Sequence, residues 1–133
     1  MTLIILYVAT AVIFLVLDAV MLTTVMKPLF ERHLGDALLT EIRFVPAVIF
    51  YLFYLFVLQW LVTAPALEAG PSWRLALNAA LFGAVAYGTY EFTNLATLKD
   101  WSWEMVAVDL CWGIALTTVS ALGGLSVTRM LTA

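Results

Sequence analysis

Long apolar stretches alternate with short polar segments along this chain of 133 residues. Each of the four stretches approaches or exceeds the roughly 20 residues that an α-helix needs to cross a lipid bilayer. They lie at about residues 2–26, 44–62, 73–98 and 103–131. Prolines, glycines and charged residues separate them, as is typical of helix ends and turns. The pattern therefore predicts an all-α fold, a four-transmembrane-helix bundle that forms a single integral membrane domain over residues 1–133.

A shorter amphipathic pattern lies between the first two stretches, at about residues 29–42. Its apolar residues recur at the spacing of one helix face, at Phe30, Leu34, Leu38 and Ile42. Charged side chains largely avoid that face, which favours a short helix lying in the membrane interface. We expect Lys27 and Pro28 to end the first transmembrane helix, with Pro28 in the first turn of the interfacial helix.

Composition supports the membrane assignment and excludes several functions. The chain is 65% hydrophobic and 11% charged, with a mean hydropathy of +1.05, whereas soluble domains are roughly half apolar and a quarter charged. A net charge of -3 without a basic patch argues against nucleic acid binding. A single cysteine, Cys111, and a single histidine, His33, provide no thiol or histidine metal site. We expect no metal and no cofactor.

Three acidic residues, Asp18, Glu91 and Asp109, interrupt otherwise apolar stretches. Counted along each helix from the nearest connection, all three lie roughly 12 to 14 Å inside the same face of the membrane. A carboxylate is costly in hydrocarbon, so such residues usually face the interior of a bundle and mark a proton, ion or ligand site. The sequence therefore predicts one acidic layer.

No Lys or Arg accompanies these acids within their apolar stretches. Carboxylates in one poorly solvated layer repel each other, so protons, a cation or a cationic ligand must supply the balance. The side chains expected at this level are Tyr51, Tyr87, Asn94 and Trp112, which would give a polar spot with aromatic walls. The alternative is that neutral carboxyls hydrogen-bond between helices and only hold the bundle together.

Other features have structural explanations. Small residues recur at four-residue spacing in the last two stretches, which permits close contact between helices. The alternative is that they form the face of a homodimer. They are Ala80, Ala84 and Gly88, and Gly113, Thr117 and Ala121. Tryptophans at predicted helix ends are typical of an interfacial aromatic belt; they are Trp60, Trp73, Trp101 and Trp103.

Four strings of residues resemble a family of small four-helix bacterial membrane proteins of unknown function: FERHLG, FVPAVIFYLFY, TYEFTNLATLKDW and VDLCWG. The resemblance spans nearly the whole chain and implies an inner-membrane location. It places these residues at family motif positions: Asp18, Arg32, Tyr90, Glu91, Thr93, Asn94, Thr97, Asp109, Trp112 and Gly113. The chain departs from the family at Glu91, where relatives more often carry Asp, and at Glu31, where they tend to carry Tyr. The resemblance adds Tyr90 and Thr93 to the candidate site and supplies no activity.

Two function classes follow. The first is a protein that binds or transports a small or cationic ligand coupled to protons. The second, less favoured, is an enzyme that acts on a lipid-like substrate with a carboxyl group as acid or base; a structural subunit of a membrane complex is the remaining alternative. Lys and Arg are more frequent in the first and third connections, four against two, which favours cytoplasmic connections there and periplasmic termini.

Overall fold

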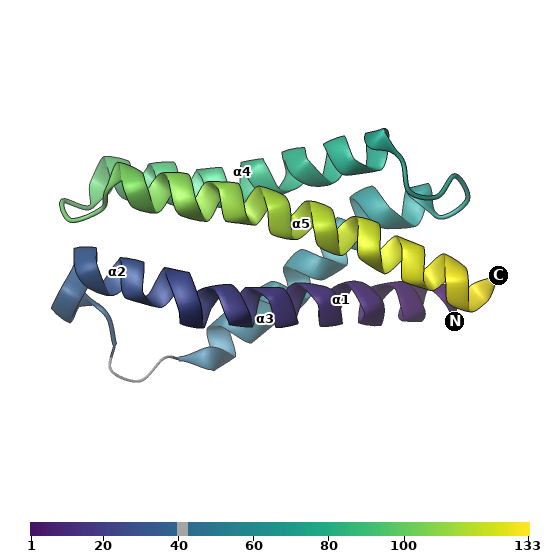
Figure 1. Ribbon diagram of the computed structural model, residues 1–133, viewed down its shortest axis with the longest axis horizontal. Coiled ribbons are helices and arrows are strands. Elements are labelled where there is room, and N and C mark those ends of the chain that lie inside the picture. Colours follow the sequence, from purple (N-terminus) through teal and green to yellow (C-terminus); the bar gives the residue numbers. More distant parts are fainter. Residues whose placement is uncertain (40–42) are drawn as a thin grey trace.

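A computed structural model of the protein describes residues 1–39 and 43–133, and the described residues form helices and turns without strands (Figure 1). The helices are α1 (Thr2–Met21), α2 (Lys27–Leu34), α3 (Phe44–Leu58), α4 (Trp73–Thr97) and α5 (Trp103–Thr132). π-helical turns follow α1 at Leu22–Met26 and α3 at Gln59–Thr63, and short 3-10 turns lie at Gly35–Ala37 and Ala64–Ala66. The predicted all-helical bundle is confirmed.

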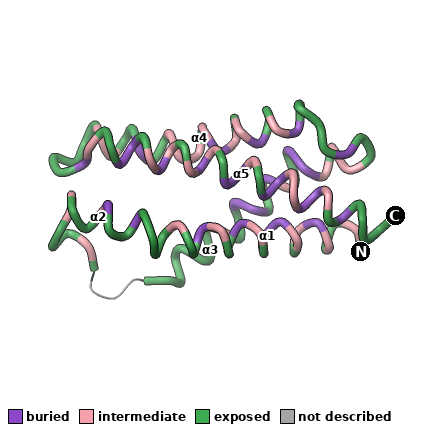
Figure 2. Tube along the Cα trace, viewed as in Figure 1, coloured by how far each residue is buried: buried purple, intermediate pink, exposed green. Residues whose placement is uncertain are grey.

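Three helical segments are long and apolar enough to cross a membrane: Thr2–Ala37, Phe44–Ala66 and Trp103–Thr132. Helix α4 has the length, at 25 residues, but polar side chains such as Asn78 and Glu91 lower its hydropathy. It runs antiparallel beside α5 in Figure 1 and packs closely along it, so we expect it to cross with α5. The outward faces of the bundle are exposed in Figure 2 and are rich in large apolar side chains, which suits a lipid surround.

The break expected at Lys27 and Pro28 is absent, because α2 continues α1 through the π-helical turn at Leu22–Met26. In a regular α-helix the proline ring would clash with the carbonyl group four residues earlier. The wider π turn immediately before α2 accommodates Pro28 without ending the helix. The helix ends instead at Leu34, where Gly35 adopts a positive φ of 53° that favours glycine. Thr40, Glu41 and Ile42 of the predicted interfacial segment lie outside the described residues.

Both termini lie at one end of the bundle in Figure 1, and α2 and the turn between α4 and α5 lie at the other.

Helices α4 and α5 begin with similar N-terminal caps. The Ser72 hydroxyl accepts a hydrogen bond from the backbone N–H of Leu75, and the Ser102 hydroxyl accepts one from Met105, each at 3.2 Å. These caps satisfy N–H groups that the first helical turn leaves free.

Two apolar clusters fill the interior. The larger contains Phe14 and Leu55 and extends toward the termini, and the smaller contains Leu29 and Met105 at the opposite end. Along α5, Asp109 lies between the residues of the two clusters. The apolar core is therefore interrupted at the level of the predicted acidic layer.

Helices α4 and α5 approach each other closely at small residues. A Cβ atom at Gly83 would lie 2.7 Å from the carbonyl oxygen of Gly113, so the two backbones are almost in contact there. The predicted α5 stripe of Gly113, Thr117 and Ala121 is buried. On α4 the buried small residues are Ala79 and Gly83. The predicted α4 stripe of Ala80, Ala84 and Gly88 is therefore displaced by one residue or more, since all three are only half-buried.

Candidate functional site

The structure gathers the three predicted acids around Asp109 of α5. The Asp109 carboxyl lies near Glu91 on α4 and near Asp18 on α1. All three residues are buried, with exposed fractions of 5% for Asp18, 0% for Glu91 and 9% for Asp109. Three helices thus contribute one carboxyl group each to the same interior region.

Glu91 forms the most enclosed part of this cluster. Its Oε1 accepts a 2.9 Å hydrogen bond from the indole N–H of Trp101, which lies in the turn between α4 and α5. Its Oε2 is buried and has no donor among the described residues. Carboxylates only accept hydrogen bonds, so Glu91 and Asp109 would need a proton on one of them to hydrogen-bond to each other.

Asp18 forms the other side of the cluster. Its Oδ1 accepts a 3.1 Å hydrogen bond from the indole N–H of Trp112, which links α1 to α5. Tyr51 on α3 also lies near the Asp18 carboxyl. The Trp112 donor holds the carboxyl beside the space between the helices, which Asp18 lines.

That space is a cavity of about 660 Å³ among α1, α2, α3 and α4, and Asp109 reaches it from α5. Asp18 and Asp109 are the acids that line it, and Glu91 is not part of the lining. Aromatic rings form much of the wall, including those of Tyr51, Tyr87 and Tyr90. A concave, mostly apolar site with a few convergent polar groups is the usual form of a small-molecule pocket.

Some of the other predicted site residues line the cavity and others do not. Tyr87 is half-buried in the cavity wall, and a side chain at Gly113 would collide with its ring. Tyr90 lines the cavity and lies near Asn94, which does not line it. Thr93 is exposed and lines no part of the cavity. The structure therefore brings Tyr51, Tyr87, Tyr90 and Trp112 to the acids and leaves Thr93 apart.

Trp101 is the main residue that the sequence interpretation misplaced. An interfacial belt was expected for four tryptophans, and Trp60, Trp73 and Trp103 are indeed about 70% exposed. Trp101 is instead 8% exposed, because its ring folds back between Phe30 and Tyr90 toward Glu91. The available signal was its position in a short turn immediately after the helix that carries Glu91.

Basic side chains do not neutralise the cluster. In residues 1–39 and 43–133 the ion pairs join Arg32 to Glu104 at 3.2 Å and, when His33 is protonated, His33 to Glu104 at 3.4 Å. Arg129 binds the backbone carbonyl groups of Leu67 and Glu68 at the other end of the bundle. Across the same described ranges, no group of three His, Cys, Asp or Glu side chains has the geometry of a metal site.

These features define a small helical membrane protein with a buried carboxyl cluster beside a cavity. The chain belongs to the family of predicted membrane proteins DUF2177, whose pattern matches residues 3–126 and confirms the resemblance seen in the motifs. No curated protein and no solved structure matches the chain.

Proposed function

We propose that this protein binds or transports a small cationic ligand in the cavity between its helices, coupled to the uptake and release of protons. The observation that carries the proposal is the cavity itself, whose lining contains Asp18 and Asp109 and no basic side chain. A cation that enters would meet negative charge in a poorly solvated space, where electrostatic attraction is stronger than in water.

The aromatic wall supports the same ligand class. Tyr51, Tyr87 and Tyr90 line the cavity beside the acids, and aromatic faces attract ammonium groups through the negative charge above the ring. Carboxylates combined with aromatic rings suit quaternary ammonium ions in particular.

The contact between Asp109 and Glu91 supports proton coupling. A proton shared between these two neighbouring carboxyls would lower the negative charge of the cluster and let them hydrogen-bond. A cation beside Asp109 would favour loss of that proton, since two positive charges would compete for the same negative groups. Binding of a cation would therefore release a proton, and acidification would weaken binding.

Tetramethylammonium is a suitable probe because its own charge does not change with pH. We expect the protein in lipid nanodiscs to bind it more weakly as the pH falls, and Asp18→Asn or Asp109→Asn to reduce the affinity at least tenfold. Glu91→Gln should retain binding with a smaller pH dependence, because Glu91 lies outside the cavity lining. Glu104→Gln, which removes an exposed acid, is the matched control. Binding that is indistinguishable in all variants would refute the proposal.

An enzyme acting on a lipid-like substrate is the second candidate, and the Asp109–Glu91 pair is the observation that favours it. Two carboxyls in contact can hold and release one proton, as a general acid or base requires. Native mass spectrometry after mild detergent extraction separates the candidates. A retained cation favours binding or transport, a retained lipid-like molecule with conversion by the purified protein favours catalysis, and a co-purifying protein favours a structural subunit.

We further infer that the protein resides in the bacterial inner membrane with both termini in the periplasm. Placement of the termini at one end of the bundle, opposite α2 and the α4–α5 turn, supports this arrangement (Figure 1). The latter end carries Lys27, Arg32 and Lys99, and basic residues prefer the cytoplasmic side.

A further inference from the structure

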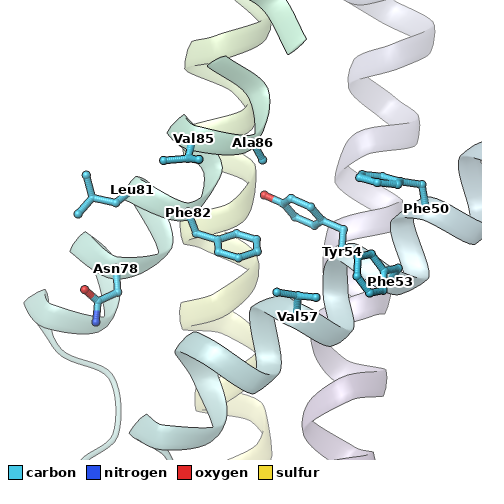
Figure 3. A pocket seen from close by; sticks show the side chains of 9 residues that line it. All are labelled: Phe50, Phe53, Tyr54, Val57, Asn78, Leu81, Phe82, Val85 and Ala86. Atoms are coloured by element: carbon cyan, nitrogen blue, oxygen red, sulfur yellow. The ribbon is translucent and has the colours of Figure 1, made fainter. Parts of the chain in front are cut away.

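A second, apolar groove lies between α3 and α4 (Figure 3). Its volume is about 420 Å³, and its wall contains Phe53, Tyr54 and Val57 from α3 and Leu81 and Phe82 from α4. The rings of Tyr54 and Phe82 meet edge to face, with centroids 5.1 Å apart. Asn78 lies in the wall on α4 and is the polar residue besides Tyr54.

The groove adjoins the acidic cavity. Phe50 and Tyr54 from α3 and Val85 and Ala86 from α4 line both spaces. Beyond this shared part, one space contains Asp18 and Asp109, and the other contains no charged side chain. We call these two adjoining spaces together the passage, which has a charged end and an apolar end.

The apolar end opens toward the lipid. Its wall includes Phe50, Phe53, Leu81 and Val85, which are exposed by 61%, 60%, 54% and 70%. In a protein that spans a bilayer, exposed apolar side chains in the middle of two helices contact acyl chains. A molecule in the bilayer thus reaches the passage sideways, without crossing water.

We propose that the ligand is an amphipathic cation with one hydrocarbon chain, which enters from the bilayer between α3 and α4. The cationic head lies at Asp18 and Asp109, and the chain lies in the groove along Phe53, Leu81 and Phe82. This inference rests on the proposed function, since it names the chemical class of the same cation and the route by which it arrives.

Charge and shape favour this occupant over others. The carboxyls lining the cavity disfavour an anionic or phosphate-bearing head, and the groove offers an uncharged surface for the rest of the molecule. Along α4 the passage runs from Tyr90 to Asn78, about 18 Å at 1.5 Å per residue. Each space has the volume of a small-molecule pocket, which suits one head and one chain.

The shared part of the passage provides the test. Ala86→Trp fills the junction, and Leu77→Trp places the same side chain on an exposed part of α4 that lines neither space. Dodecyltrimethylammonium and tetramethylammonium have the same kind of head and differ in the chain. Because Ala86 also lines the acidic cavity, we expect Ala86→Trp to weaken the binding of both cations in nanodiscs of neutral lipid, and that of dodecyltrimethylammonium at least tenfold more than that of tetramethylammonium. Leu77→Trp should change neither.

Crosslinking of the parent protein keeps the inference testable if Ala86→Trp does not fold. A dodecyltrimethylammonium analogue with a diazirine at the chain end should label groove residues such as Phe53 and Leu81, and tetramethylammonium should prevent that labelling. Labelling that spreads over exposed α1 residues such as Val12 and Val16 without protection would overturn the inference.

The two proposals fail in different ways. If Ala86→Trp leaves dodecyltrimethylammonium binding unchanged while Asp109→Asn abolishes it, the groove is not the site of the chain and the cationic cavity stands. If both cations bind equally to the parent, Asp18→Asn and Asp109→Asn, the proposed function fails and this inference fails with it.

Discussion

The indole nitrogen of Trp101 lies 2.9 Å from Oε1 of Glu91, so the turn between α4 and α5 folds back onto a carboxyl group with no exposed surface. Phe30 of α2 packs against the same indole ring, with centroids 5.3 Å apart, and Tyr90 packs at 5.8 Å. Trp101 therefore contacts both α2, through Phe30, and the carboxyl cluster, through Glu91.

Trp101→Phe should destabilise the protein by about 1–3 kcal/mol, because Glu91 loses its hydrogen-bond donor while remaining buried. Thermal unfolding in detergent, followed by circular dichroism, measures the effect. Trp103→Phe is the matched control, since Trp103 is 69% exposed and such surface changes usually stay within about 0.5 kcal/mol. The double variant Trp101→Phe/Glu91→Leu should recover most of the loss, because both polar partners are then removed. Equal stability of Trp101→Phe and Trp103→Phe would contradict this account.

The helical fold and the acidic cluster follow from patterns that local sequence carries. Apolar stretches of membrane length fix the helices, and the cost of a carboxyl in hydrocarbon directs Asp18, Glu91 and Asp109 inward. Their levels along the helices then bring them together. Tyr51 and Trp112 join them because they lie at the same level on neighbouring helices.

Features that depend on tertiary contacts could not be read in this way. Pro28 predicts a helix end, yet a π-helical turn lets α1 continue into α2. Trp101 lies at a predicted helix end, where a tryptophan usually indicates an interfacial aromatic belt. Only the conformation of the turn between α4 and α5 brings its side chain to Glu91. The groove between α3 and α4 depends on the path of α3 relative to α4, which helical periodicity does not determine.

Gly83→Ala should destabilise the α4–α5 contact. The added Cβ would lie 2.7 Å from the carbonyl oxygen of Gly113, and a backbone atom cannot move aside without separating the helices. A cost of about 1–3 kcal/mol is typical of such overpacking. Gly88→Ala is the control on the same helix, because its Cβ would meet Leu110 at 3.7 Å, an ordinary contact. That variant should be neutral or stabilising by up to about 1 kcal/mol through helix propensity. A larger loss of thermal stability in Gly88→Ala than in Gly83→Ala would contradict the packing described.

Asp109→Asn should retain the fold and raise the free energy of unfolding by up to about 2 kcal/mol, as removal of a costly functional group often does. The amide keeps the size of the side chain, removes a negative charge from the cluster and supplies N–H donors for the unpaired Oε2 of Glu91. Asp36→Asn, at an exposed position, should leave stability unchanged. Chemical unfolding in mixed micelles provides the measurement. A clear loss of stability in Asp109→Asn would show that the ionised carboxyl itself holds the helices together, which is the structural alternative to a ligand site.

Single-cysteine labelling should reveal both termini outside the cytoplasm. In a Cys111→Ser background, Glu68→Cys introduces one thiol beside the Arg129 contact at the end that carries the termini, and Asp36→Cys introduces one beyond α2; both positions are exposed. The connections at the α2 end carry four basic residues and those at the other end carry two, which favours a cytoplasmic location for the α2 end. In intact bacteria a membrane-impermeant maleimide should therefore label Glu68→Cys, and Asp36→Cys only after permeabilisation. The Cys111→Ser parent should remain unlabelled in both conditions. The reverse pattern would invert the topology and move the acidic layer to the outer half of the membrane, so that cations would reach Asp18 and Asp109 from the outer leaflet.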